Sequence, residues 1–154
     1  MDKRIKAIQV ALKKAEISLQ QAEHAYALAE KSYLEFCQQQ QSVNSIKQNV
    51  EDEINRALEP GASLNSMALQ SLRIYLYEVD RRLETISFEV DISEREMKSR
   101  KSVVQKIHLR MKGLERKLED TIKRREYELE KKSSKEIEEL FLMRGAHTKA
   151  RLTV

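Results

Sequence analysis

The stretch Glu59-Pro60-Gly61-Ala62-Ser63-Leu64-Asn65-Ser66 holds the only proline of the 154-residue chain and one of its three glycines. Pro60 lacks a backbone donor and disfavours helical geometry at the residue before it, so an incoming helix should stop at Glu59. Gly61 can take the positive φ that a turn requires, and Ser63 or Ser66 can cap the first amides of a second helix. The stretch therefore predicts a turn at 60–65 between helices at 3–59 and 66–144.

Apolar residues recur every seven positions, in two interleaved sets, on both sides of this turn. Before the turn the sets are Ile5, Leu12, Leu19, Tyr26, Tyr33, Gln40, Lys47, Ile54 and Ile8, Ala15, Ala22, Ala29, Phe36, Val43, Val50, Ala57. After the turn they are Leu69, Leu76, Leu83, Val90, Met97, Val104, Met111, Leu118 and Leu72, Val79, Ile86, Ser93, Arg100, Ile107, Leu114, Thr121. Of these 32 positions 27 are apolar, against about 13 expected from a 40% hydrophobic share, so they indicate a coiled-coil seam.

A short turn sets the register of the two helices. If Ala57 faces Leu69, the numbers of facing seam residues sum to 126. The polar positions of the seam then pair as Arg100 with Tyr26, Ser93 with Tyr33, and Lys47 with Val79. We expect the first two to be buried pairs, and the Lys47 ammonium to reach water on its apolar stem. A slip of one heptad would pair Tyr33 with Arg100, but it would leave 58–75 as a loop, so the shorter turn is preferred.

The predicted fold class is all-α, a long antiparallel two-helix coiled-coil hairpin with a C-terminal single-helix overhang. We expect one helical-hairpin domain over 1–145, with Gly145 as the C-terminal stop, and a flexible tail over 146–154. Because the chain start should lie near Arg125, the overhang has no helix of its own chain to pack against. Single helices are marginal in water without packing, so the overhang either frays or is held by another protein.

The sequence gives no support for an enzyme, and it implies no cofactor and no metal. His24, His108 and His147 are scattered, and there is no Gly-rich phosphate loop, Cys-x-x-Cys pair or His-Glu-x-x-His motif. Cys37 is the only cysteine, which excludes an internal disulfide and favours the reducing cytosol. No apolar run is long enough for a signal peptide or a membrane span, so we expect a cytoplasmic protein without direct membrane insertion.

Charge is uneven along the chain. Residues 36–98 hold 7 Lys+Arg and 11 Asp+Glu, a net charge of −4. The whole chain has 29 Lys+Arg and 25 Asp+Glu, so the other residues hold 22 Lys+Arg and 14 Asp+Glu, a net charge of +8. A solvated coiled-coil surface with i,i+4 ion pairs explains such charge, but a basic end could also dock on an acidic surface. Nucleic acid is a weaker expectation, because acidic residues are interleaved and aromatic side chains for base stacking are few.

Four large apolar residues lie off the seam along one outer stripe of the second helix: Ile74, Tyr77, Phe88 and Ile92. Scattered exposed apolar residues are normal on protein surfaces. Their helical spacing also fits a patch for a partner helix or groove, and the two interpretations remain open.

Two segments resemble the FliJ/YscO family of flagellar and virulence type III secretion proteins. They are Leu69-Gln70-Ser71-Leu72-Arg73-Ile74-Tyr75-Leu76-Tyr77-Glu78-Val79 and Lys131-Lys132-Ser133-Ser134-Lys135-Glu136-Ile137-Glu138-Glu139-Leu140. The layout of a helical hairpin, a Pro/Gly turn near residue 60 and a C-terminal overhang is also similar to this family and covers nearly the whole chain.

The resemblance implies a non-enzymatic central stalk at the cytoplasmic face of the secretion apparatus. Its partners would be a hexameric secretion ATPase, the export-gate membrane protein and export chaperones. The ATPase contact is expected at Arg124, Arg125, Ile137, Leu140 and Phe141. The gate or chaperone contact carried over by position falls near Leu72, Leu76, Val79 and Leu83, which are seam positions, and we add the outward Ile74, Tyr77 and Phe88. The alternatives are a generic coiled-coil adaptor or tether and a nucleic-acid-binding helical arm.

Overall fold

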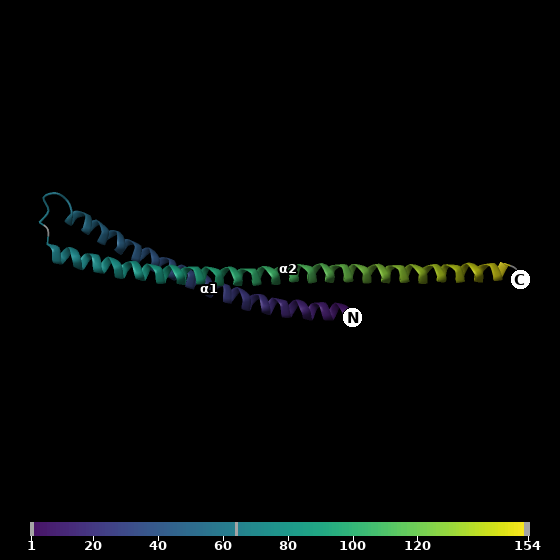
Figure 1. Ribbon diagram of the computed structural model, residues 1–154. Helices are drawn as coiled ribbons and strands as arrows, with labels where there is room; N and C mark the ends of the chain where they lie inside the picture. The colour runs from purple at the N-terminus through teal and green to yellow at the C-terminus, as the bar shows by residue number, and fades with distance from the viewer. Residues whose placement is uncertain (1, 64, 153–154) are drawn as a thin grey trace. The chain divides into compact units, whose positions relative to one another are not determined.

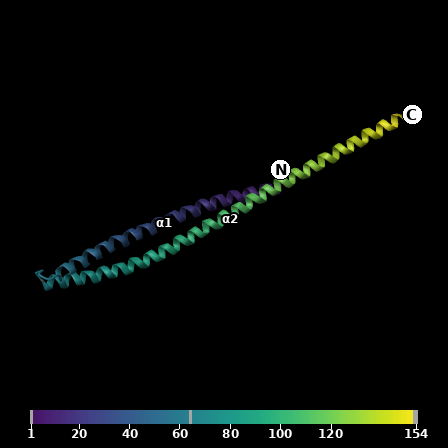
Figure 2. The same ribbon diagram turned by 90° about the horizontal axis from the view of Figure 1, so that it is seen from above.

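Two long α-helices and one short turn account for the described part of the chain, residues 2–63 and 65–152 of a computed structural model (Figures 1 and 2). Helix α1 runs from Lys3 to Ala57, and helix α2 runs from Ser66 to Leu152. The two helices pack against each other in opposite directions. The fold is therefore the predicted all-α helical hairpin.

The turn forms as its proline and glycine predict. The Glu59 carbonyl accepts a hydrogen bond from the Ala62 amide at 3.2 Å, and Gly61 has a φ of 91°. Pro60 at the second position and a positive-φ glycine at the third are the signature of a type II turn. Helix α1 ends two residues before the predicted stop, at Ala57, and Leu64 lies outside the described residues.

The cap of α2 is a residue that the sequence interpretation did not select. The Asn65 side-chain oxygen accepts hydrogen bonds from the amides of Met67 at 3.2 Å and Ala68 at 3.4 Å. This contact satisfies two of the amides that a helix start leaves without a partner, which is the role expected of Ser63 or Ser66. Asp2 caps α1 in the same way, accepting from the Arg4 amide at 3.0 Å.

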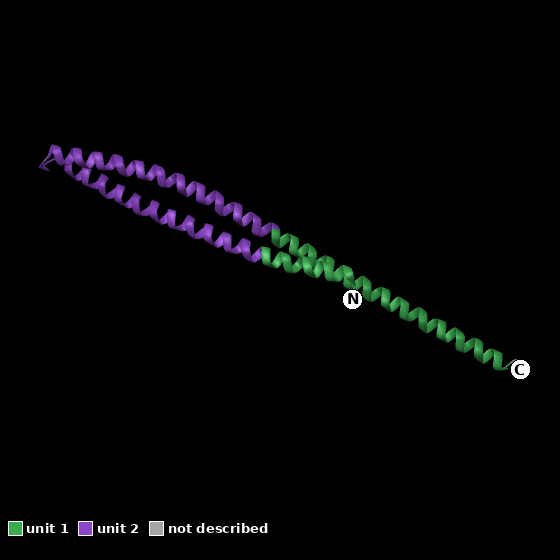
Figure 3. Cartoon of the chain, turned by 90° about the horizontal axis from the view of Figure 1, so that it is seen from below, with its two compact units in different colours: residues 1–18, 107–154 green, residues 19–106 purple. Residues whose placement is uncertain are grey.

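The seam positions form the interior of each of the two compact units of the chain, residues 19–106 and residues 1–18 with 107–154 (Figure 3). Of the 32 predicted seam residues, 31 are buried or half-buried, so the heptad assignment is confirmed for both helices. Within residues 19–106 the most buried apolar side chains are Val79 at 1% exposure, Val50 at 6% and Val43 at 8%.

Two polar contacts establish the register within residues 19–106. The Gln40 side-chain amide donates to the Ser87 hydroxyl at 3.1 Å, and the Lys47 ammonium lies 2.9 Å from the Asp80 carboxylate. The predicted register places Gln40 opposite Ile86 and Lys47 opposite Val79, and each observed partner is the next residue along α2. The short-turn register is therefore confirmed in this unit, and the heptad slip is excluded.

The other unit, residues 1–18 with 107–154, contains the start of α1 and the end of α2. Ile5, Ile8 and Ala15 of α1 are at most 8% exposed, so the start of α1 is packed along its seam face. Beyond this packed region, every described residue of α2 from Glu126 to Leu152 is exposed. We call this segment, residues 126–152, the overhang.

Three further expectations are wrong. Arg100 is not a buried partner of Tyr26: its side chain is 51% exposed and lies 3.8 Å from Glu96 on the same helix. A long charged side chain can leave the seam when a carboxylate one turn away offers a partner in water.

Ser93 is buried as expected, but its hydroxyl donates to the Val90 carbonyl at 2.9 Å and thus finds its hydrogen bond within α2. The third error is the helix end at Gly145, because α2 continues through 146–152. A glycine in a helix costs about 1 kcal/mol relative to alanine, which does not end a helix when the glycine lacks a positive φ. Residues 153 and 154 lie outside the described residues.

Candidate partner-binding surfaces

The overhang exposes three large apolar side chains on one side of α2. Ile137, Leu140 and Phe141 are spaced by three and four residues and are 59%, 60% and 78% exposed. Residues with this spacing lie next to one another on a helix surface. Among the predicted contact residues, these three form one continuous apolar face.

A basic hollow of about 680 Å³ lies where the start of α1 meets α2 within residues 1–18 and 107–154. Its walls carry four cationic side chains and a single carboxylate, together with small and apolar residues: Arg4, Arg116, Lys117, Arg124, Asp120, Ala7, Ile8, Gly113 and Thr121. Positive groups gathered in a concave site attract anionic partners. The hollow suits an anionic partner better than a metal cation or an apolar ligand.

The two predicted arginines at this end differ in their surroundings. Arg124 is exposed and lines the basic hollow, whereas Arg125 is half-buried. Next to them, a hydrogen bond from Lys123 to Glu119 at 2.9 Å raises the pKa of the Lys123 ammonium. Lys123 is thus already paired within α2, and Arg124 is the more available of these cations for a partner.

The second predicted contact, on α2 after the turn, separates into inner and outer residues. Ile74, Tyr77 and Phe88 are 57%, 65% and 66% exposed, so all three can meet a partner. The four residues carried over from the family resemblance lie in the seam instead: Leu72, Leu76 and Leu83 are half-buried, and Val79 is 1% exposed. A partner could reach Val79 only by opening the hairpin.

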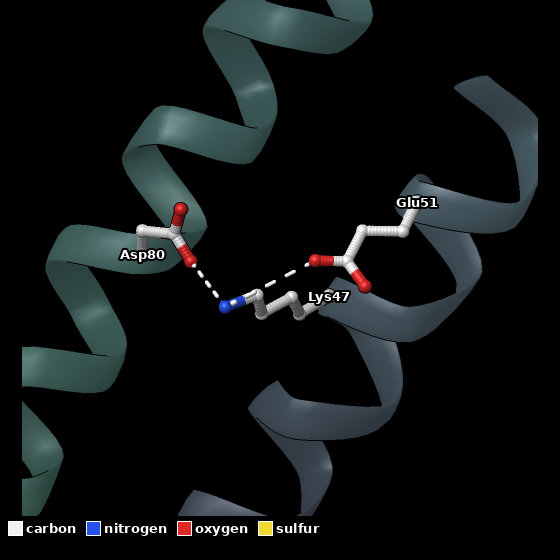
Figure 4. A network of polar contacts seen from close by, with 3 residues as sticks. All are labelled: Lys47, Glu51 and Asp80. Carbon is white, nitrogen blue, oxygen red and sulfur yellow. Dashed lines mark ion pairs between the residues drawn. The ribbon is translucent and has the colours of Figure 1, made fainter. Parts of the chain in front are cut away.

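Phe88 stands at the edge of an acidic hollow of about 640 Å³ in residues 19–106, lined also by Lys47, Asp80, Leu83, Glu84, Ser87 and Asp91. The Asp80 hydrogen bond, and then its charge, raise the pKa of Lys47, and Glu51 adds to this from 4.0 Å (Figure 4). The sequence analysis missed this hollow. The recurrence of carboxylates at Asp80, Glu84 and Asp91 beside the seam was the signal that could have revealed it.

Nothing in residues 2–63 and 65–152 gathers three His, Cys, Asp or Glu side chains around a possible metal ion. His24, His108 and His147 are each exposed. Cys37 is half-buried, and its side-chain hydrogen bond with Tyr33, with the Glu94 charge, raises the pKa of the Tyr33 phenol. Over the same described residues, neither helix contains an apolar stretch that could cross a bilayer.

Comparison of the chain with protein-family models, with curated proteins and with solved structures found no match. The surfaces described above are therefore the basis for a proposed function.

Proposed function

We propose that this protein is a non-enzymatic stalk of an export apparatus of the FliJ/YscO kind, whose overhang binds inside a hexameric secretion ATPase. The observation that carries the proposal is the overhang itself. It extends α2 well beyond the packed start of α1, and Ile137, Leu140 and Phe141 are exposed, with no second helix covering them among the described residues.

An exposed apolar face on a lone helix has a physical consequence. Burying a large apolar side chain is worth about 1.5–3 kcal/mol, and a single helix gains order when its apolar face is packed. A ring-shaped partner can surround such a helix and cover its apolar face. The basic hollow at the base of the overhang would then meet acidic groups at the mouth of the ring.

The outer side of α2 within residues 19–106 supplies the second part of the proposal. Ile74, Tyr77 and Phe88 would contact the export-gate protein or export chaperones, on the outer side of α2. We leave Leu72, Leu76 and Val79 out of this contact, because they pack inside the hairpin. In this arrangement the protein would work in the cytoplasm, at the face of the secretion apparatus.

The test measures ATP hydrolysis by the export ATPase of the same cell with and without this chain. Alanine at all five predicted contact residues, Arg124, Arg125, Ile137, Leu140 and Phe141, should abolish stimulation. The control variant replaces Leu142, which is 74% exposed and points away from the face of Ile137 and Leu140, and it should stimulate as the unaltered chain does. Circular dichroism at 222 nm must show equal helicity in both. Unchanged stimulation by the five-residue variant would refute the ATPase contact.

The same preparation distinguishes the alternatives. A generic adaptor would bind other proteins while leaving the ATPase unbound and unstimulated. A nucleic-acid-binding arm would retain DNA or RNA on the basic hollow, with an affinity that falls steeply as salt rises, because phosphate contacts release counterions.

A further inference from the structure

One side of the overhang carries a regular stripe of eight residues: Glu126, Glu130, Ser133, Ile137, Leu140, Arg144, His147 and Arg151. The steps between them alternate between four and three residues along the whole stripe. This is the spacing of a coiled-coil seam, which places all eight on one side of α2. All eight are exposed, so this seam has no second helix within the described part of the chain.

The two ends of the stripe carry opposite charges, so two copies of the stripe laid in opposite directions would be complementary. Two carboxylates, Glu126 and Glu130, stand at its N-terminal end, and Ile137 and Leu140 form the apolar centre. The C-terminal end is basic, with Arg144, His147 and Arg151. A second copy laid antiparallel on this stripe would bring opposite charges together at both ends and apolar groups together in the middle. We propose that the protein forms an antiparallel homodimer through this stripe.

The pairing has one natural register. Ile137 packs on Leu140 of the second copy, so that the numbers of facing residues sum to 277. Glu126 then faces Arg151 and Glu130 faces His147 of the second copy, each twice in the symmetric dimer. A parallel pairing would place Glu126 on Glu126 and Arg151 on Arg151, and the like charges would repel.

The length of the overhang also fits a second copy. In this register Leu152 of the second copy lies opposite Arg125, next to the first residue of the overhang. The start of α1 is placed before that point, because Arg4 lines the basic hollow together with residues up to Arg124. Each overhang is therefore covered from one end to the other, and the packed region of neither hairpin is displaced.

The first experiment measures dimerisation of the full chain by sedimentation equilibrium, with no export component present. We expect a dimer with a Kd of about 100 μM or tighter, because each chain contributes a short apolar centre and two charged ends. Glu126→Arg and Arg151→Glu should each weaken the dimer by about tenfold or more, since each change turns two attractive pairs into two repulsive ones. The double variant, Glu126→Arg with Arg151→Glu, should recover the original affinity.

A matched control separates local pairing from net charge. Glu128→Arg changes the net charge as Glu126→Arg does, but Glu128 lies on the side of α2 opposite the stripe. It should leave the Kd unchanged. A chain that stays monomeric at about 100 μM, or a double variant as weak as the single ones, would overturn the proposal.

A second experiment tests the direction of pairing with spin labels, in a Cys37→Ser background. Residue 138 lies level with residue 139 of the second copy, so two labels at Glu138→Cys are close together in the dimer. Lys131, one heptad earlier on the same side of α2, lies level with residue 146, so two labels at Lys131→Cys are separated by about 22 Å along the helix axis at 1.5 Å per residue. A parallel dimer would give equally short distances at both positions and would contradict the antiparallel register.

The dimer covers Ile137 and Leu140, which also belong to the proposed ATPase contact. Dimer and ring therefore exclude each other, a consequence that rests on the proposed function. If the charge variants lose dimerisation and keep ATPase stimulation, the dimer stands and is separable from the ring contact. If dimerisation is absent while the five-residue variant loses stimulation, only the dimer fails.

Discussion

Val79→Ala should destabilise the hairpin, although the family resemblance places this residue among partner contacts. Val79 is 1% exposed and is the largest fully buried side chain among the described residues. It faces the Lys47 position, where the Lys47–Asp80 ion pair closes the side of the seam. Its contribution should therefore come from packing between α1 and α2, in the absence of any partner.

Two opposing contributions set how far Val79→Ala lowers the free energy of unfolding. Removing about two methylene equivalents from a buried site loses about 1.6 kcal/mol of transfer free energy at ~0.8 kcal/mol each, before any cavity cost. Alanine is a better helix former than valine by about 0.6 kcal/mol, which offsets part of this loss. The free energy of unfolding should fall by about 1–1.5 kcal/mol, since a two-helix seam can close much of the space that is left.

The assay is urea unfolding followed by circular dichroism at 222 nm, because the chain has no tryptophan. Val103→Ala is the matched control: it makes the same substitution in the same helix and unit, at a site that is 44% exposed. There the propensity gain should dominate, and stability should stay equal or rise by about 0.5 kcal/mol. If both variants change stability by the same amount and in the same direction, Val79 is not a seam residue and the hairpin packing described here is wrong.

Three further substitutions test the Pro60-Gly61 turn, the Asn65 cap of α2 and the Lys47–Asp80 ion pair, and a fourth, at Gly145, is the control for the turn. Gly61→Ala should lower the free energy of unfolding by about 1 kcal/mol because its φ is 91°, while Gly145→Ala, in a helix, should raise helicity at 222 nm. Asn65→Ala should cost about 1 kcal/mol in urea unfolding through loss of the α2 cap. Asp80 raises the pKa of Lys47 above 10.5, so the stability advantage over Asp80→Asn should be full below pH 10.5. It should vanish as pH rises through the raised pKa, and thermal melts from pH 7 to 11 that show a constant difference would contradict this.

The hairpin was predictable because its information is local and periodic. Pro60 and Gly61 specify the turn, and valines such as Val43 and Val50 mark the buried side of the helices. Once the turn length is given, the register follows, and the Gln40–Ser87 hydrogen bond agrees with it. Few other packings would bury so many apolar residues of the same two stripes.

The polar details were less predictable, because several partners compete for one polar group at similar free energy. Ser93 could bond across the seam or to the Val90 carbonyl, and the bond within its own helix needs no second element to be placed. Arg100 could lie on an aromatic ring or pair with Glu96 in water, and it takes the hydrated position. Asp80, in contrast, pairs across the seam with Lys47 of α1. This pairing depends on the side chains beside the seam, which heptad spacing alone does not position.

The candidate contact surfaces were predictable only on the overhang, where α2 has no facing residues of α1. The overhang follows from the unequal lengths of the two helices, and the exposure of Ile137 and Phe141 agrees with that expectation. The half-buried position of Arg125, and the acidic hollow beside Phe88, depend on how neighbouring side chains pack. Such packing is not encoded in the spacing of apolar residues.

The unpaired end of α2 has a consequence for the lifetime of the protein in a cell. Lys131, Lys132 and Lys135 lie in a helix that opens locally at little cost, whereas the packed seam resists opening. A trypsin-like protease should therefore trim the free chain beyond Arg125 and spare the hairpin. The fraction of chain recovered at full length from a cell extract then measures how often a partner covered the overhang before lysis.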